Sequence, residues 1–109
     1  GFVDFWTDQA SQGSSEVVVA VVDTGLQMDH PDIQGSVNVV AGWDMVSDID
    51  VANDGNGRDG DANDPGDVCP QAGILSNTYH GTHVAGIIGA AATNNSDGVA
   101  GGAWNVKVV

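Results

Sequence analysis

The stretch His80-Gly81-Thr82-His83-Val84-Ala85-Gly86 opens an uncharged segment, rich in glycine, alanine and isoleucine, that runs to about residue 93. This composition predicts a buried helix, in which Gly86 and Gly89 let neighbouring segments pack closely. His80 stands at the N-terminal end of the helix, from where its imidazole can project into a cleft. Because histidine titrates near neutral pH, it can take up a proton and return it. The stretch therefore predicts a central helix and a candidate general base.

A carboxylate that suits this histidine lies upstream, in Val21-Val22-Asp23-Thr24-Gly25. Residues 17–22 are all small or β-branched apolar residues, which predicts a strand buried on both faces of a parallel sheet. Asp23 follows at the carboxyl end of that strand, the edge where catalytic groups gather in open α/β sheets. From there its carboxylate can accept the Nδ1 proton of His80 and fix the tautomer of the ring.

The remaining elements indicate an α/β fold with a mostly parallel central sheet. Residues 37–44 are a weaker strand candidate, and residues 106–109 read as the start of another strand. The order strand, strand, long loop, helix, strand favours parallel pairing. Because the chain stops inside a strand, we expect a truncated piece of one domain, which folds poorly alone because its sheet has unpaired edges. We divide it into an aromatic N-terminal segment and loop (1–16), strands with the aspartate (17–44), an acidic insert loop (45–79), and the histidine helix, a turn and a strand start (80–109).

The charge balance restricts the partners of the chain. Fifteen acidic residues face only Arg58 and Lys107, for a net charge of −13. Nucleic acid is excluded as a partner, because neutralising phosphates requires Lys and Arg. No stretch approaches the roughly 18–20 apolar residues that span a membrane. So many carboxylates repel one another unless solvent or cations screen them, and calcium is the cation that prefers oxygen ligands.

Eight of the fifteen acidic residues lie between Asp44 and Asp67, in a Gly-rich loop that is unusually long for a compact domain. Carboxylates at every second or third position resemble calcium loops that wrap one ion. The loop is no EF-hand, because an arginine displaces an expected carboxylate and no glutamate closes it. A solvated acidic loop is the alternative. The predicted site comprises Asp54, Arg58, Asp59, Asp61, Asp64 and Asp67.

Four motifs occur in the order found in the subtilisin-like serine proteases, the subtilases. They are residues 21–25, His30-Pro31-Asp32, residues 80–86, and Asn94-Asn95-Ser96-Asp97-Gly98-Val99-Ala100-Gly101. From about residue 17 to residue 109 the chain resembles the N-terminal part of a subtilase catalytic domain, and its acidic insert is similar to that of secreted bacterial members. The resemblance implies a subtilisin-like three-layer fold and an extracellular location.

The resemblance also assigns catalytic roles. It implies that Asp23 is the orienting aspartate, that His80 is the general base and that His83 is structural. The family's serine lies in a Gly-Thr-Ser motif that these 109 residues lack. We therefore expect the serine on the remainder of the catalytic domain, and we expect this chain alone to be inactive.

The resemblance implies a first calcium site as well. Its ligands would be the Asp32 carboxylate, the side chain of Asn95 and the backbone carbonyls of Thr93, Asp97 and Val99. With the acidic loop this makes two expected Ca²⁺ sites. For Asp32 the alternative is a turn cap after Pro31.

Three further points concern cysteine, zinc and the overall function. By resemblance Cys69 pairs in a disulfide with a cysteine beyond residue 109, the alternative being a buried free thiol. Zinc at His80 and His83 is excluded, because the i,i+4 spacing and the glutamate of the metalloprotease motif are missing. The sequence thus predicts a serine endopeptidase that cuts protein or peptide substrates. The rival interpretation is a catalytically inactive, calcium-binding α/β module.

Overall fold

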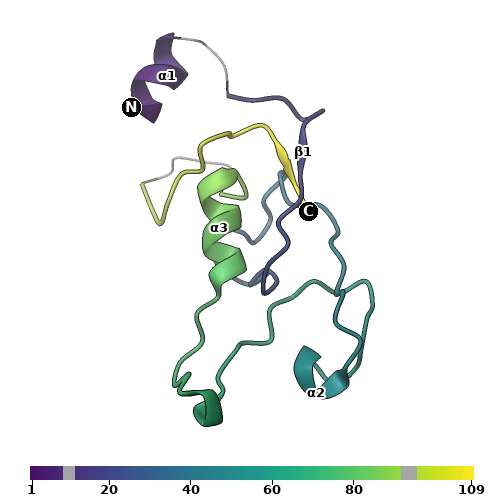
Figure 1. The fold of residues 1–109 in the computed structure, drawn as a ribbon. Helices are drawn as coiled ribbons and strands as arrows, with labels where there is room; N and C mark the ends of the chain where they lie inside the picture. Colours follow the sequence, from purple (N-terminus) through teal and green to yellow (C-terminus); the bar gives the residue numbers. More distant parts are fainter. Residues whose placement is uncertain (9–11, 92–95) are drawn as a thin grey trace.

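The computed structural model describes residues 1–8, 12–91 and 96–109. Figure 1 shows a central helix beside a short sheet, with the N-terminal helix at one end and the acidic loop at the other. The elements in chain order are α1 (Phe2–Asp8), β1 (Val18–Val19), α2 (Ile49–Ala52), the 3₁₀ helix η1 (Pro70–Ala72), α3 (His80–Ile88) and β2 (Lys107–Val108). The helices of the described ranges are too short to cross a membrane.

The sheet brings together the three segments predicted as strands. β1 pairs in parallel with β2, with Val19 opposite Val108. On the other side of β2, Val39 forms a parallel bridge with the same Val108. The prediction of a parallel α/β arrangement is confirmed. The regular strands are shorter than residues 17–22 and 37–44, because the pairing extends only as far as residues 107–109 offer partners.

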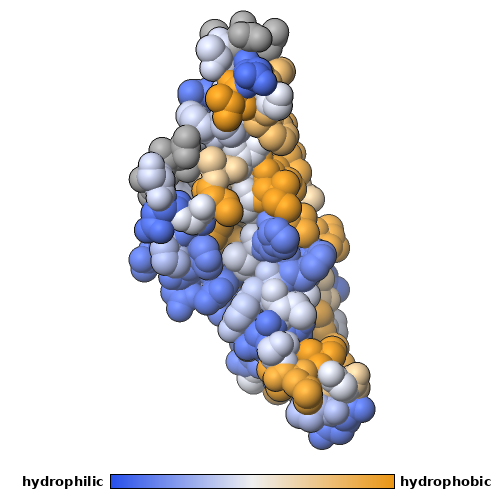
Figure 2. All heavy atoms as spheres, turned by 90° about the vertical axis from the view of Figure 1, so that its left-hand side faces the viewer, coloured by the Kyte–Doolittle hydropathy of each residue, from blue (hydrophilic) through white to orange (hydrophobic). Residues whose placement is uncertain are grey.

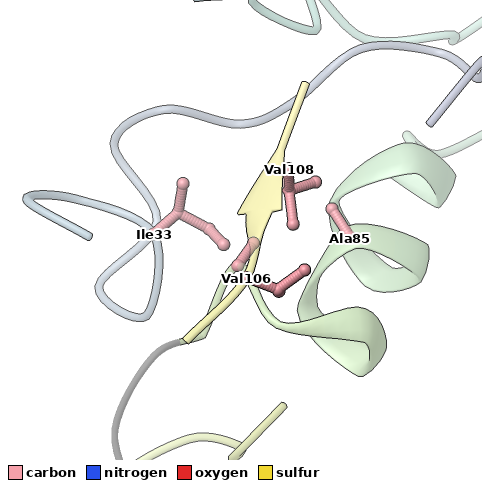
Figure 3. Close-up of a cluster of buried hydrophobic side chains, with 5 residues drawn as sticks. Ile33, Ala85, Val106 and Val108 are labelled. Atoms are coloured by element: carbon pink, nitrogen blue, oxygen red, sulfur yellow. The ribbon is translucent and has the colours of Figure 1, made fainter. Parts of the chain in front are cut away.

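Helix α3 packs against the sheet and forms the core with it. The helix ends at Ile88, where the N–H of Gly89 bonds to the carbonyl of Ala85, and not near residue 93 as the sequence predicts. Residues 92–95 lie outside the described part. Figure 3 shows Ala85 of α3 directed at valines of the 106–108 segment, with Ile33 on their other side. The buried cluster consists of Ile33, Ala85, Ala90, Val106 and Val108.

The expectation that residues 17–22 are buried on both faces is wrong for this structure. Val19 and Val21 pack against the core. Val18 and Val22 point to the opposite face by strand alternation and are 61% and 95% exposed. The physical reason is that, within the described ranges, α3 covers one face of the sheet and no second layer covers the other. Of the three layers expected, the described chain forms the sheet and one helical layer. Figure 2, a view from the left of Figure 1, shows further apolar side chains at the surface.

The aromatic N-terminal segment is attached to the rest of the chain by ring contacts and one hydrogen bond. The rings of Phe2 and Trp6 stack with centroids 5.8 Å apart, and Trp6 lies 4.6 Å from Trp104. The indole N–H of Trp6 donates to the carbonyl of Gly102 at 2.9 Å. These contacts attach α1 to the segment that leads into β2.

The acidic loop is ordered by a local device that the sequence analysis missed. In the segment from residue 44 to residue 66, aspartates repeatedly accept a hydrogen bond from the backbone N–H two residues later, the Asx turn. The spacing of aspartates through a Gly- and Asn-rich loop is the sequence pattern that could have predicted these turns. The residues that do this are Asp44, Asp48, Asp54, Asp59, Asp61 and Asp64.

Asn38 is a buried polar residue that the sequence analysis also missed. It is 1% exposed, and its Nδ2 donates to the carbonyls of Gly89 at 2.7 Å and Trp104 at 2.9 Å. One carbonyl belongs to the residue that caps α3, and the other to the segment before β2. Asn38 therefore joins the helix to the sheet by satisfying carbonyls that would otherwise be buried without a donor.

We predict that Asn38→Ala in the complete protein lowers the free energy of unfolding by about 1–3 kcal/mol, because two buried carbonyls lose their donor. The rate of thermal inactivation measures the change where unfolding is irreversible. Asn105→Ala, at an exposed asparagine of the neighbouring segment, is the matched control and should change little. Equal stability of the two variants would contradict this role for Asn38.

Candidate active site

The predicted aspartate and histidine meet in the structure. Asp23 follows the β1 segment at its carboxyl end, and His80 is the first residue of α3. The Nδ1 atom of His80 lies 2.9 Å from Oδ1 and 2.8 Å from Oδ2 of Asp23. The fold thus places side chains that are 57 residues apart in the sequence within hydrogen-bond distance.

The surroundings of this pair determine its protonation. The backbone N–H of Thr24 donates to Oδ1 of Asp23 at 2.8 Å, and this bond, followed by that from His80, lowers the pKa of Asp23 below its usual value. The carboxylate is therefore ionised at neutral pH and can only accept, so the proton of the imidazole resides on Nδ1. In that tautomer the lone pair of Nε2 faces away from Asp23, on a side chain that is 63% exposed.

Two glycines and two threonines of the sequence motifs hold the start of α3 close to the loop after Asp23. Gly25 has a φ of +109°, and a Cβ at Gly81 would overlap the carbonyl oxygen of Gly25. The N–H of Gly81 donates to Oγ1 of Thr24 at 3.1 Å, and Thr82 Oγ1 accepts from the N–H of Gln27 at 2.8 Å. The start of α3 is therefore pressed against the loop that carries Asp23.

The segment before His80 is shaped by side-chain hydrogen bonds that the sequence analysis did not predict. Tyr79 is a left-handed residue with φ 46°, and its hydroxyl accepts from Nδ2 of Asn77 at 3.0 Å. The carboxylate of Asp67 accepts the hydroxyl of Thr78 at 2.6 Å and its N–H at 2.7 Å. The side-chain bond from Thr78 is the largest cause of the lowered pKa of Asp67. These bonds therefore fix the backbone conformation of the loop that leads to His80 at the start of α3.

His83, one turn further along α3, has an exposed side chain, and its structural role stays a prediction.

The residues of the first predicted calcium site come together in part. Oδ2 of Asp32 accepts the N–H of Val99 at 3.0 Å. Gly98 leaves room for this carboxylate, because a Cβ there would overlap it. The Asp32 carboxylate thus reaches a distant turn, and a carboxylate oxygen is one of the ligands that calcium prefers. Thr93 and Asn95 lie outside the described residues.

The predicted site in the acidic loop is not assembled in the same way. Within residues 1–8, 12–91 and 96–109, no three His, Cys, Asp or Glu side chains gather as metal ligands would. Arg58 directs Nη2 at the sulfur of Met45, 3.5 Å away. Asp64 is 6% exposed, and its Oδ1 and Oδ2 accept bonds from Gly66 and Thr24. In Asp54, Asp59 and Asp61 one carboxylate oxygen accepts the hydrogen bond of an Asx turn.

Cys69 is an exposed free thiol, so the alternative of a buried free thiol does not hold, and its disulfide stays a prediction.

A carboxylate-oriented imidazole at the edge of a parallel sheet is an arrangement that nucleophilic hydrolases use for proton transfer. Comparison with known proteins identifies the family within this class of hydrolases. Residues 14–109 match the subtilase family, and the chain belongs to that family.

Individual relatives agree with this assignment. An extracellular protease of Xanthomonas campestris pv. campestris is 50% identical over 101 residues, which cover 87% of this chain and 17% of the relative. Thermitase of Thermoactinomyces vulgaris is 42% identical, over 84% of this chain and 24% of the relative. A solved protease structure from Pseudoalteromonas arctica superposes with a TM-score of 0.74 at 51% identity, over 87% of this chain and 28% of that one. The chain therefore spans less than a third of the length of each of these proteins.

We predict that Gly81→Ala in the complete protein displaces His80 from Asp23 and lowers activity by roughly 100-fold, since small misplacements of reacting groups are costly. Gly86→Ala is the matched control in the same helix. A Cβ there would lie 3.9 Å from Val99, an ordinary contact, so this variant should stay active and gain helix stability. Peptidase assays and thermal unfolding of both variants check the prediction, and an active Gly81→Ala protein would contradict it.

Proposed function

We propose that the complete protein is a secreted serine endopeptidase, and that this chain supplies the aspartate and histidine of its Asp-His-Ser triad. The observation that carries the proposal is the pair of contacts from Nδ1 of His80 to both oxygens of Asp23. Family membership and relatives named as extracellular proteases support the reaction type and the location.

In this mechanism His80 Nε2 removes the proton of the serine hydroxyl as it attacks the peptide carbonyl. The same nitrogen then protonates the leaving amine. Asp23 keeps the ring in the tautomer with Nδ1–H and stabilises the imidazolium that forms between the two transfers. The exposure of His80 leaves its Nε2 edge accessible to a serine and a peptide.

The serine and the remainder of the catalytic domain are proposed as the partners of this chain. The 109 residues contain no Gly-Thr-Ser motif, and the relatives are several times longer. Val18 and Val22 leave an uncovered apolar face on the sheet, opposite α3. A further layer of the domain packed there would bury this face and complete the third layer.

Calcium is proposed at the Asp32 turn, where it would stabilise the fold. Asp32 would give a carboxylate oxygen, Asn95 a side-chain oxygen, and Thr93, Asp97 and Val99 backbone carbonyl oxygens. The ion would supply positive charge that holds this acidic segment together, and it takes no part in the proton transfers. The acidic-loop site stays a prediction without assembled ligands.

We predict that Asp23→Asn in the complete protein lowers kcat by about 10⁴-fold with little change of fold, the scale of loss for this change in a trypsin-type triad. The NH₂ group of asparagine can donate a hydrogen bond to Nδ1, which an ionised carboxylate cannot do, so the imidazole loses its productive tautomer. Hydrolysis of a peptide substrate measures the effect, and Asp29→Asn, an exposed aspartate nearby, is the control.

A fluorophosphonate probe separates this proposal from the inactive calcium-binding module. Labelling of a serine in the complete wild-type protein, lost on His80→Ala, is the expected result. A folded, calcium-loaded protein that is neither labelled nor hydrolytic would overturn the proposal.

Calcium removal tests the Asp32 site. We predict that a chelator lowers the thermal unfolding midpoint of the complete protein, since a ligand at 100 times its Kd adds about 2.7 kcal/mol to stability. Asp32→Asn keeps an acceptor for the N–H of Val99 but removes charge, so it should require more calcium for the same midpoint. If Asp32→Asn and Asp29→Asn respond equally to calcium, the ion does not bind at Asp32.

A further inference from the structure

Three chain segments meet beside the Asp23–His80 pair. The N–H of Leu26 donates to the carbonyl of Ala62 at 2.9 Å, and the N–H of Asp64 donates to the carbonyl of Leu26 at 3.1 Å. These bonds attach the acidic loop directly to the loop that follows Asp23. The third segment is the start of α3, which is attached to the loop after Asp23 because the N–H of Gly81 donates to Oγ1 of Thr24.

The hydroxyl of Thr24 is the point where the three segments are joined. The N–H of Gly81 donates to this oxygen at 3.1 Å, and the hydroxyl lies 2.6 Å from Oδ2 of Asp64. Because a carboxylate only accepts, the hydroxyl must donate to Asp64 and accept from Gly81. The direction of both bonds is thereby determined.

Asp64 is itself firmly held. It is 6% exposed, and its other oxygen accepts the N–H of Gly66 at 2.8 Å. Among the described loop residues, Asp64 is the aspartate that is buried as a whole residue, and most of the others are exposed. A buried carboxylate with both oxygens bonded orients its partners and is poorly suited to bind an ion from solvent.

We propose that Asp64 is a positioning residue for the Asp23–His80 pair and acts through the hydroxyl of Thr24. The backbone N–H of Thr24 bonds to Asp23 and its hydroxyl to the residue after His80. Thr24 therefore sets the spacing of acid and base, and Asp64 holds the side chain of Thr24 in the rotamer that does so. This inference rests on the proposed function and adds a residue to its machinery.

The carboxylate is needed because its two oxygens serve two donors. An asparagine at position 64 has one oxygen and one NH₂ group. If its oxygen serves the N–H of Gly66, its NH₂ faces the Thr24 hydroxyl, reverses that group and competes with the N–H of Gly81. If the amide turns over, the N–H of Gly66 faces another donor. Asp64→Asn thus disturbs the network in either orientation with almost no change of shape.

The test compares variants of the complete protease by kcat and KM on a peptide substrate. We expect Asp64→Asn and Thr24→Val each to lower kcat by roughly 10- to 100-fold with little change in KM, because the acid–base geometry shifts while the substrate surface does not. Thr24→Ser keeps the hydroxyl and should retain most of the activity. The double variant Asp64→Asn/Thr24→Val should be no slower than Thr24→Val alone, because the two residues act as one unit. Asp50→Asn, an exposed aspartate of the same loop, is the charge control.

Several results would overturn the inference. Unchanged kcat in Asp64→Asn would do so, and so would additive losses in the double variant or equal losses in Thr24→Ser and Thr24→Val. Assays at low and at saturating calcium exclude an indirect effect: a loss in Asp64→Asn that added calcium reverses counts against positioning. If Asp64→Asn does not fold, the comparison of Thr24→Val with Thr24→Ser decides. Failure of the proposed function is distinguishable, since wild-type protein would then show no fluorophosphonate labelling.

Discussion

The close approach of the start of α3 to the loop after Asp23 is the constraint on which the site depends. A helix and a strand end can come this near only if one of the facing residues lacks a side chain, and Gly81 meets that condition against the backbone of Gly25. At this separation the hydroxyls of Thr24 and Thr82 can bond across the gap to backbone N–H groups. The His80–Asp23 contact is a consequence of this packing, because Gly81, Thr24 and Thr82 already hold the two segments together.

The acidic loop shows a second principle, in which a highly charged segment gains order from its own backbone. Short-range bonds from aspartates to the N–H two residues later replace regular secondary structure over much of the segment. Each turn is weak and local. What ties the loop to the rest of the molecule is the pairing of residues 62–64 with Leu26 and the inward-pointing Asp64. The distant charges can therefore vary without disturbing the site, whereas this attachment cannot.

The sequence predicted the site better than it predicted the sheet. Asp23 and His80 could be identified because their neighbours, Thr24 and Gly81, are required by local packing and leave a readable motif. Asp64 could not be distinguished, because which of many similar aspartates turns inward depends on a threonine 40 residues away. The predicted burial of residues 17–22 was too high. An apolar run shows that a strand can pack on both faces, but it does not show whether a layer covers each face. Asn38 was missed for a related reason: its partners are backbone carbonyls, which no side-chain pattern reveals.

The order of segments in the sheet also has a kinetic meaning. β2 lies between β1 and the segment around Val39, so residues 107–108 are flanked on both sides by segments made much earlier in the sequence. Neither neighbour can pair until residues 107–109 have been made, and the intervening chain must close a long loop to bring them there. During synthesis the valines of β1 and Val39 therefore stay without their strand partner until residues 107–109 have followed, and over that interval their apolar side chains are open to contacts with other chains.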